Sequence, residues 1–172
     1  SQHLEVIHDG RMVRLVSPPG SELRLRGQAF ALLEVHFHVP GEHRINGEAG
    51  AAEIHFLHQG VQGRLLIVAV RVHAGRRGNS VMTRLLDHLP SGAGATSRFS
   101  NVGINPLFLL PGEKSYFAYT GSLATPPCTE PVTWLVMAEP LELETGQLRA
   151  LAQVTGPNAR PVQPLNGRGV LG

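Results

Sequence analysis

Hydrophobic and polar residues alternate along six short stretches of the chain, and turn-forming residues bound each stretch. A period of two sends successive side chains to opposite faces, which is typical of a β-strand with one buried face. Alternation predicts strands over residues 12–16, 31–39, 52–58, 64–73, 115–119 and 132–138. Apolar residues at helical spacing predict short surface helices over residues 80–89 and 144–153.

Turn signals set the order in which these strands pair. Asn46-Gly47 predicts a turn between the second and third strands, and residues 59–63 predict a hairpin between the third and fourth. Long loops are expected over 90–97 and 155–172. The pattern therefore predicts a mostly β fold, with a central, largely antiparallel twisted sheet and a few short surface helices.

Composition narrows the class of protein. Over 172 residues, 42% are hydrophobic and 16% charged, which predicts one globular domain spanning 1–172 and excludes a disordered chain. The net charge is only +2 and no basic run exceeds Arg76-Arg77, so we expect no nucleic-acid partner. The longest apolar stretch, 65–70, is far below the roughly 18 residues of a membrane span, so we expect no membrane partner.

Histidine is the residue type that points to chemistry. The chain has nine, and five lie between positions 36 and 58. His36 and His38 share one face of a predicted strand, and His55 lies on the neighbouring strand, where cross-strand partners are about 5 Å apart. Three imidazoles with the fourth position left to solvent would form an open zinc site.

The histidines also admit interpretations other than an open zinc site. A His-x-His pair alone is a weak signal, but carboxylates at Glu34 and Glu53 are placed to support the histidines from behind. The pair followed by Glu42 also resembles the first cupin motif, although the second cupin motif is missing downstream. We expect His43 and His58 to be hydrogen-bonded structural residues, since a fourth protein ligand would close the site.

Five motifs together resemble the alpha-class carbonic anhydrases. They occur in the family's order and cover nearly all of the chain. The motifs are His36-Phe37-His38, Gly41-Glu42-His43, the segment AAEIHFLH at 51–58, the segment YTGSLATPPCTEPVTW at 119–134, and NARPVQPLNGR at 158–168.

This resemblance implies a zinc enzyme that hydrates carbon dioxide reversibly to bicarbonate and a proton. It implies that His36, His38 and His55 hold Zn²⁺, that Glu53 orients His55, and that Glu42 and Thr125 belong to the catalytic set. It also implies an apolar wall for carbon dioxide, although packing in the core would explain the same residues: Leu57, Ile67, Leu123 and Trp134.

The chain departs from the family pattern at two positions near the expected zinc. Ala124 replaces the threonine whose hydroxyl bridges the zinc-bound hydroxide and the glutamate at Glu42, so we expect slower catalysis. Thr125 is a partial substitute for that hydroxyl. Glu34 replaces the usual glutamine behind His36, and its charge is expected to raise the pKa of zinc-bound water.

The family's N-terminal segment has no counterpart here, so we expect a domain without that segment. The opening residues resemble the strand that carries the proton shuttle, with His3 one position out of register as a candidate shuttle. Apolar surface left bare predicts a homodimer. Similar bacterial members are commonly periplasmic or secreted, so we expect the same location for this protein. The alternative function is a zinc-binding, catalytically weak relative with a role in binding or assembly.

Overall fold

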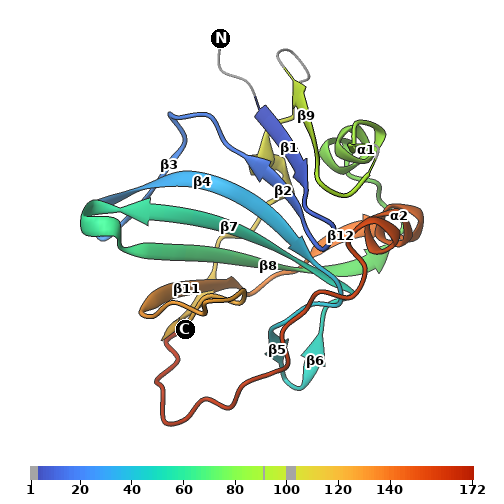
Figure 1. Cartoon of the computed structure of the whole chain (residues 1–172). Helices are drawn as coiled ribbons and strands as arrows, with labels where there is room; N and C mark the ends of the chain where they lie inside the picture. Colours follow the sequence, from blue (N-terminus) through green and yellow to red (C-terminus); the bar gives the residue numbers. More distant parts are fainter. Residues whose placement is uncertain (1–3, 91, 100–103) are drawn as a thin grey trace.

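One large mixed sheet organises the molecule (Figure 1). The structure is a computed structural model that describes residues 4–90, 92–99 and 104–172. Within these ranges the ten-stranded sheet has the order β10-β11-β8-β7-β4-β2-β1-β9, with β12 beside β8 and β3 beside β4. Its strands are β1 (Leu4–His8), β2 (Val13–Val16), β3 (Glu22–Leu25), β4 (Gln28–His38), β7 (Ala52–Gly60), β8 (Leu65–Gly75), β9 (Ala95–Phe99), β10 (Tyr116–Gly121), β11 (Val132–Met137) and β12 (Leu141–Glu144).

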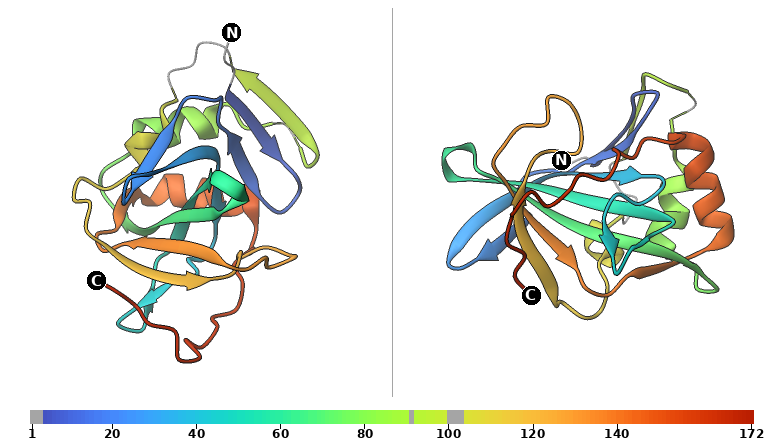
Figure 2. Two further views of the ribbon diagram at one scale, coloured as in Figure 1. Left: turned by 90° about the vertical axis from the view of Figure 1, so that its left-hand side faces the viewer. Right: turned by 90° about the horizontal axis from the view of Figure 1, so that it is seen from below.

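Both faces are buried along most of β7 and β8 and along the second half of β4. On one face, apolar side chains such as Val35, Phe37, Ile54 and Phe56 form the main core. Helices α1 (Ser80–Asp87) and α2 (Thr145–Thr155) contact each other and add their apolar residues to this core (Figures 1 and 2). The opposite face carries the histidines and a smaller apolar cluster that includes Trp134. Alternation along these strands thus separates the core from the candidate site.

The predicted antiparallel order of the three central strands is confirmed, with two parallel pairings added. β4 pairs with β7 and β7 with β8, both antiparallel. β8 then accepts β11 and β12 as parallel neighbours. The sheet is therefore largely antiparallel but mixed, and β8 is the strand at which the direction of pairing changes.

The chain between β4 and β7 folds into a small hairpin of its own. β5 (Arg44–Ile45) pairs with β6 (Glu48–Ala49) around the predicted turn, where Asn46 and Gly47 have φ angles of 53° and 82°. Gly41 donates its N–H to the carbonyl of Gly50 at 3.0 Å, and a Cβ on Gly41 would lie 2.9 Å from that oxygen. Glycine at this position therefore lets the segment that carries Glu42 and His43 lie directly against β7.

Some elements differ from the sequence prediction. The loop expected over 90–97 is wrong in part, because β9 begins at Ala95 and pairs with β1 through backbone hydrogen bonds. Strands β3 and β12 were also not among the predicted strands, whereas β1 lies in the opening segment that resembles a strand of the family. The irregular segment expected after residue 155 is confirmed, and only Leu171 forms an isolated bridge, with Ala118. Among the described residues, neither helix has the length and hydropathy needed to cross a bilayer.

Candidate metal centre

Three imidazole rings meet on the polar face of β4 and β7. His36 and His38 lie two residues apart on β4, and His55 on β7 is the direct cross-strand partner of His36. The ring centroids are 4.5 to 5.2 Å apart, and one nitrogen from each ring lies within 4.8 Å of the others. All three residues are buried. The structure therefore brings together the three predicted ligands.

The donor atoms have the chemistry that a zinc ion needs. Burial lowers the pKa of His38 to about 2 and that of His55 to about 4, so both rings are neutral at pH 7. Nε2 of His38 and Nδ1 of His55 are buried with no hydrogen-bond partner among the described residues. Unpaired buried polar atoms cost roughly 1–3 kcal/mol each. Neutral imidazoles are the usual nitrogen ligands of catalytic zinc, so these residues fit the ion.

Both carboxylate oxygens of Glu53 accept hydrogen bonds. Oε1 accepts from Nδ1 of His43 at 2.5 Å and from Nε2 of His55 at 2.7 Å. Oε2 accepts from the backbone N–H groups of Glu42 and His43 at 2.9 and 2.8 Å. Burial acts to raise the pKa of Glu53, but the hydrogen bonds from the two histidines hold it well below its usual range. The carboxylate is therefore charged and can only accept.

Glu34 is the carboxylate beside His36. Its Oε1 is 3.4 Å from Nδ1 of His36, and its Oε2 is 3.5 Å from the guanidinium of Arg14. The interaction with His36 lowers the pKa of Glu34 against the effect of burial, and Arg14 lowers it further. The negative charge behind His36 is thus shared with an arginine that sequence reasoning did not associate with the site.

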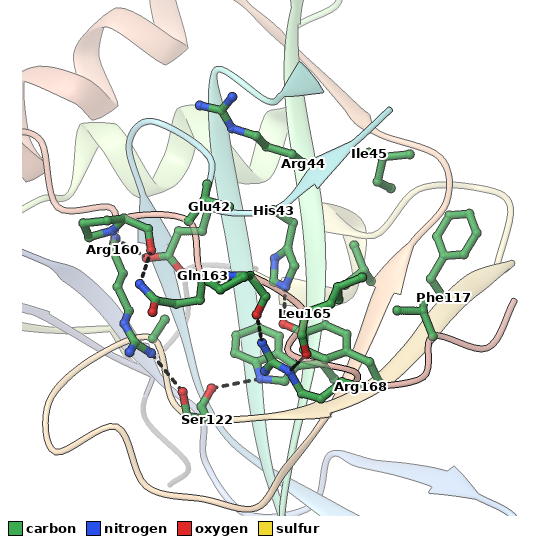
Figure 3. A pocket seen from close by; sticks show the side chains of 18 of the residues that line it. Glu42, His43, Arg44, Ile45, Phe117, Ser122, Arg160, Gln163, Leu165 and Arg168 are labelled. Carbon is green, nitrogen blue, oxygen red and sulfur yellow. Dashed lines mark hydrogen bonds between the residues drawn. The ribbon is translucent and has the colours of Figure 1, made fainter. Parts of the chain in front are cut away.

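Glu42 connects the site to the irregular C-terminal segment. Its Oε1 lies 3.3 Å from Nδ1 of His38 and accepts the backbone N–H of Arg160 at 2.8 Å (Figure 3). Burial raises the pKa of Glu42 to about 7. The guanidinium of Arg160 in turn donates to Oγ of Ser122 at 2.9 Å, two residues before Ala124. Arg160 therefore links the predicted catalytic carboxylate to the loop that lacks the family threonine.

The four residues predicted as a substrate wall lie in one apolar cluster on the histidine face. Ile67 and Trp134 are buried in it, and Leu57 and Leu123 pack against them, as does Ala124. The indole of Trp134 donates to the carbonyl of Ser122 at 3.0 Å, which fixes the loop against the sheet. The cluster therefore places apolar side chains on the same face of the sheet as the imidazoles.

A separate cavity of about 600 Å³ lies between this cluster and the C-terminal segment (Figure 3). Glu42, His43 and Tyr119 line one part of it, and residues of the C-terminal segment such as Arg160 and Leu165 line the rest. The three candidate ligands are not among the lining residues. The cavity is therefore bounded by residues that support the candidate ligands, such as Glu42 and His43, and not by the ligands themselves.

The remaining predicted residues are placed as follows. His43 is hydrogen-bonded, as expected, to Glu53 and to the hydroxyl of Tyr119. His58 is also hydrogen-bonded, through Nδ1 to the carbonyl of Phe56. Thr125 lies in the loop after Ala124, and its carbonyl accepts the N–H of Cys128. His3, the candidate proton shuttle, lies outside the described residues.

Sequence reasoning gave no supporting role to Arg160, Asn158 or Tyr119. Each lies far along the chain from the residue it supports, with separations of 118 residues for Arg160 and Glu42 and 76 for Tyr119 and His43. No local spacing signals such a contact. Their occurrence inside the quoted motifs is the only signal in the sequence that could have drawn attention to them.

Comparison with known proteins identifies the family of this chain. The family model for eukaryotic-type carbonic anhydrase matches residues 1–172. A carbonic anhydrase from Nostoc sp. is 38% identical over 98% of this chain and 63% of its own length, and one from Klebsiella pneumoniae is 34% identical over 98% and 69%. This chain thus spans about two thirds of these relatives.

Solved structures agree with the family model. The alpha-carbonic anhydrase of Photobacterium profundum superposes with a TM-score of 0.93 at 38% identity, covering 99% of this chain and 78% of that one. An alpha-carbonic anhydrase from Thermovibrio ammonificans gives 0.94 at 35% identity, covering 100% and 76%. The chain belongs to the eukaryotic-type carbonic anhydrase family.

Proposed function

We propose that this protein catalyses the zinc-dependent, reversible hydration of carbon dioxide to bicarbonate and a proton. The observation that carries the proposal is the convergence of three buried imidazoles, each with one ring nitrogen within 4.8 Å of the others. The names of the relatives support the same reaction. A zinc ion bound by three histidines supplies an acidic water, with a pKa of about 7 in carbonic anhydrase, as a nucleophile at neutral pH.

The residues of this chain have separate tasks in that reaction. His36, His38 and His55 would hold the ion, and Glu53 fixes which nitrogen of His55 is free to do so. The apolar cluster around Ile67 lies on the same face of the sheet as the imidazoles, where it would offer carbon dioxide a surface without competing hydrogen bonds. Proton export is assigned to His3 as a prediction.

Ala124 sets the expected rate. A methyl group can neither donate a hydrogen bond to Glu42 nor accept one from the attacking solvent. The orientation of that solvent is therefore left to Thr125 and to ordered water. Orienting hydrogen bonds of this type are worth roughly 2–4 kcal/mol in a transition state. We therefore expect an active but slowed enzyme. The same alanine favours the second candidate, a zinc-binding relative without significant turnover.

Two measurements separate these candidates. Metal analysis of purified protein should give one zinc per chain, and His38→Ala should abolish it while His88→Ala, outside the histidine cluster, should not. Stopped-flow hydration of carbon dioxide by the zinc-loaded protein should exceed the rate with the same concentration of free zinc. Zinc binding without that excess would favour the second candidate, and absence of zinc would contradict both.

We also propose that the protein forms a homodimer. Exposed apolar side chains gather on the C-terminal segment, at Val162, Leu165, Val170 and Leu171, and Tyr116 on β10 is exposed as well. Exposed apolar patches often mark interaction sites, and these side chains are the candidates for one here. Light scattering at micromolar concentration should give twice the mass of the chain, and a monomeric mass would contradict the proposal.

A further inference from the structure

A chain of hydrogen bonds runs from β10 to the candidate ligand His55. The hydroxyl of Tyr119 lies 2.6 Å from Nε2 of His43, and Nδ1 of His43 lies 2.5 Å from Oε1 of Glu53. The same carboxylate oxygen lies 2.7 Å from Nε2 of His55. Each step is short enough for a strong hydrogen bond. The direction in which each bond is donated therefore decides which nitrogen of His55 is left free.

The carboxylate of Glu53 fixes that direction, because its Oε2 already accepts two backbone N–H groups and its Oε1 faces both ring nitrogens. Because it is acceptor-only, Nδ1 of His43 and Nε2 of His55 must both carry a hydrogen. When His43 carries its only ring hydrogen on Nδ1, Nε2 has a lone pair, and that lone pair needs a donor. The hydroxyl of Tyr119 is in position to be that donor. Burial raises the pKa of Tyr119 and the carboxylate of Glu53 raises it further, so the hydroxyl keeps its proton.

Packing restrains the orientation of the His43 and His55 rings, but it does not determine which ring nitrogen carries the hydrogen. The ring of Trp134 lies edge-on to His43 and to His55, with centroids 4.9 Å away in both cases. Tyr119 lies parallel to Trp134 at 6.1 Å, and the guanidinium of Arg168 lies 5.8 Å from the centre of the tyrosine ring. These contacts would position a phenylalanine at 119 equally well. The hydroxyl therefore has an effect that shape does not supply.

We propose that Tyr119 is a positioning residue for the metal centre. By donating to Nε2 of His43, it keeps His43 in the form that donates to Glu53. Glu53 then stays oriented on Nε2 of His55, and Nδ1 of His55 stays free to bind a metal. The proposal rests on the proposed function only in that zinc is the ion whose affinity is affected.

The test compares zinc affinity, measured by competition with a chelator, in the wild type and in Tyr119→Phe. Residues that support a metal ligand directly contribute about 10–100-fold in affinity. We expect a smaller loss for this more distant residue, about 3- to 10-fold in affinity. Tyr116→Phe is the matched control, because Tyr116 is the exposed tyrosine on the same strand and should leave affinity unchanged. Equal affinities in wild type and Tyr119→Phe would overturn the proposal.

A double-mutant cycle and a spectroscopic measurement separate positioning from general stability. In a His43→Asn background, Tyr119→Phe should reduce zinc affinity no further, whereas an undiminished loss would contradict the relay. In metal-free protein, the ¹⁵N shifts of His43 should show a hydrogen on Nδ1 and none on Nε2, and this pattern should weaken in Tyr119→Phe. A hydrogen on Nε2 in the wild type would overturn the proposal. Because the shifts need no metal, failure of wild-type zinc binding would count against the proposed function alone.

Discussion

Asn158 and Val39 hydrogen-bond to each other in both directions across 119 residues of sequence. The N–H of Val39 donates to Oδ1 of Asn158 at 2.8 Å, and the N–H of Asn158 donates to the carbonyl of Val39 at 3.0 Å. The side-chain amide of Asn158 also donates to the carbonyls of Phe37 and Arg11. One residue of the irregular C-terminal segment therefore holds that segment beside the strand that carries His36 and His38.

Asn158→Asp should destabilise the fold. Aspartate keeps the acceptor for the N–H of Val39, but it loses the two hydrogen bonds that the side-chain amide donates to Phe37 and Arg11. We expect a loss of about 1–3 kcal/mol in the free energy of unfolding, measured by urea denaturation. Asn105→Asp is the matched control, because Oδ1 of Asn105 acts only as an acceptor, for the N–H of Leu107, in the hydrogen bonds found for it. Similar stability in both variants would show that the donated bonds contribute little.

Glu53→Gln should weaken zinc binding by about 10–100-fold. An amide cannot accept four N–H groups, and its own NH₂ would face one of the present donors, so the orientation of His55 would be lost. Chelator competition measures the effect. Glu48→Gln, at an exposed position on β6, is the control and should bind zinc as the wild type does. An unchanged affinity in Glu53→Gln would mean that His55 is oriented by packing alone.

Ala124→Thr should raise the rate of carbon dioxide hydration several-fold, because it adds a hydroxyl to the cavity that Ala124 and Glu42 both line. Ala124→Val has nearly the same shape without the hydroxyl, and it should not raise the rate. Stopped-flow kinetics on zinc-loaded proteins compares the three. If the threonine and valine variants are equally active, the hydroxyl has no role in this chain.

The turn between β8 and α1 should make stability depend on pH. Oε1 of Glu142 accepts the N–H groups of Arg76 and Arg77 at 2.7 and 3.1 Å, and the bonds from Arg77 and then Arg76 lower the pKa of Glu142 below 4.5. A carboxylate whose pKa is lower in the folded state stabilises the fold above its unfolded pKa. This stabilisation is lost as the pH falls through the folded value.

Glu142→Gln should therefore lower the melting temperature at pH 7, and the difference from the wild type should shrink as the pH falls below 4.5. Glu113→Gln, at an exposed loop position, should show no such difference. Melting curves from pH 3.5 to 8 decide the point. A difference that is constant with pH would rule out the charge of Glu142 as its cause.

Local patterns in the sequence predicted the strands that carry the ligands. Alternation located β4 and β7, and the Asn46-Gly47 turn implied that they are neighbours, so His36, His38 and His55 could be placed together. Each of these inferences uses residues close in sequence, for which the period of side-chain direction is a sufficient guide. The same reasoning placed Glu53 on the face of His55.

Other features depend on contacts that no local pattern encodes. The parallel pairing of β11 with β8 is set by long-range packing, since both strands are buried runs with no register signal. β9 is rich in small and polar residues, and it is a strand because β1 offers its backbone an edge to pair with. The contacts of Arg160 and Tyr119 with the site likewise exist only once the sheet and the C-terminal segment have come together.

The bond between Glu42 and Arg160 has a consequence for the order of assembly in the cell. Glu42 is synthesised 118 residues before the backbone group that it binds. At 5–20 residues per second, the ribosome takes roughly 6 to 24 s to cover that distance. Once His55 has also been made, the histidine cluster can form, but the contact between Glu42 and Arg160 still has to wait for Arg160. This carboxylate therefore reaches its final set of contacts only after Arg160 has been synthesised.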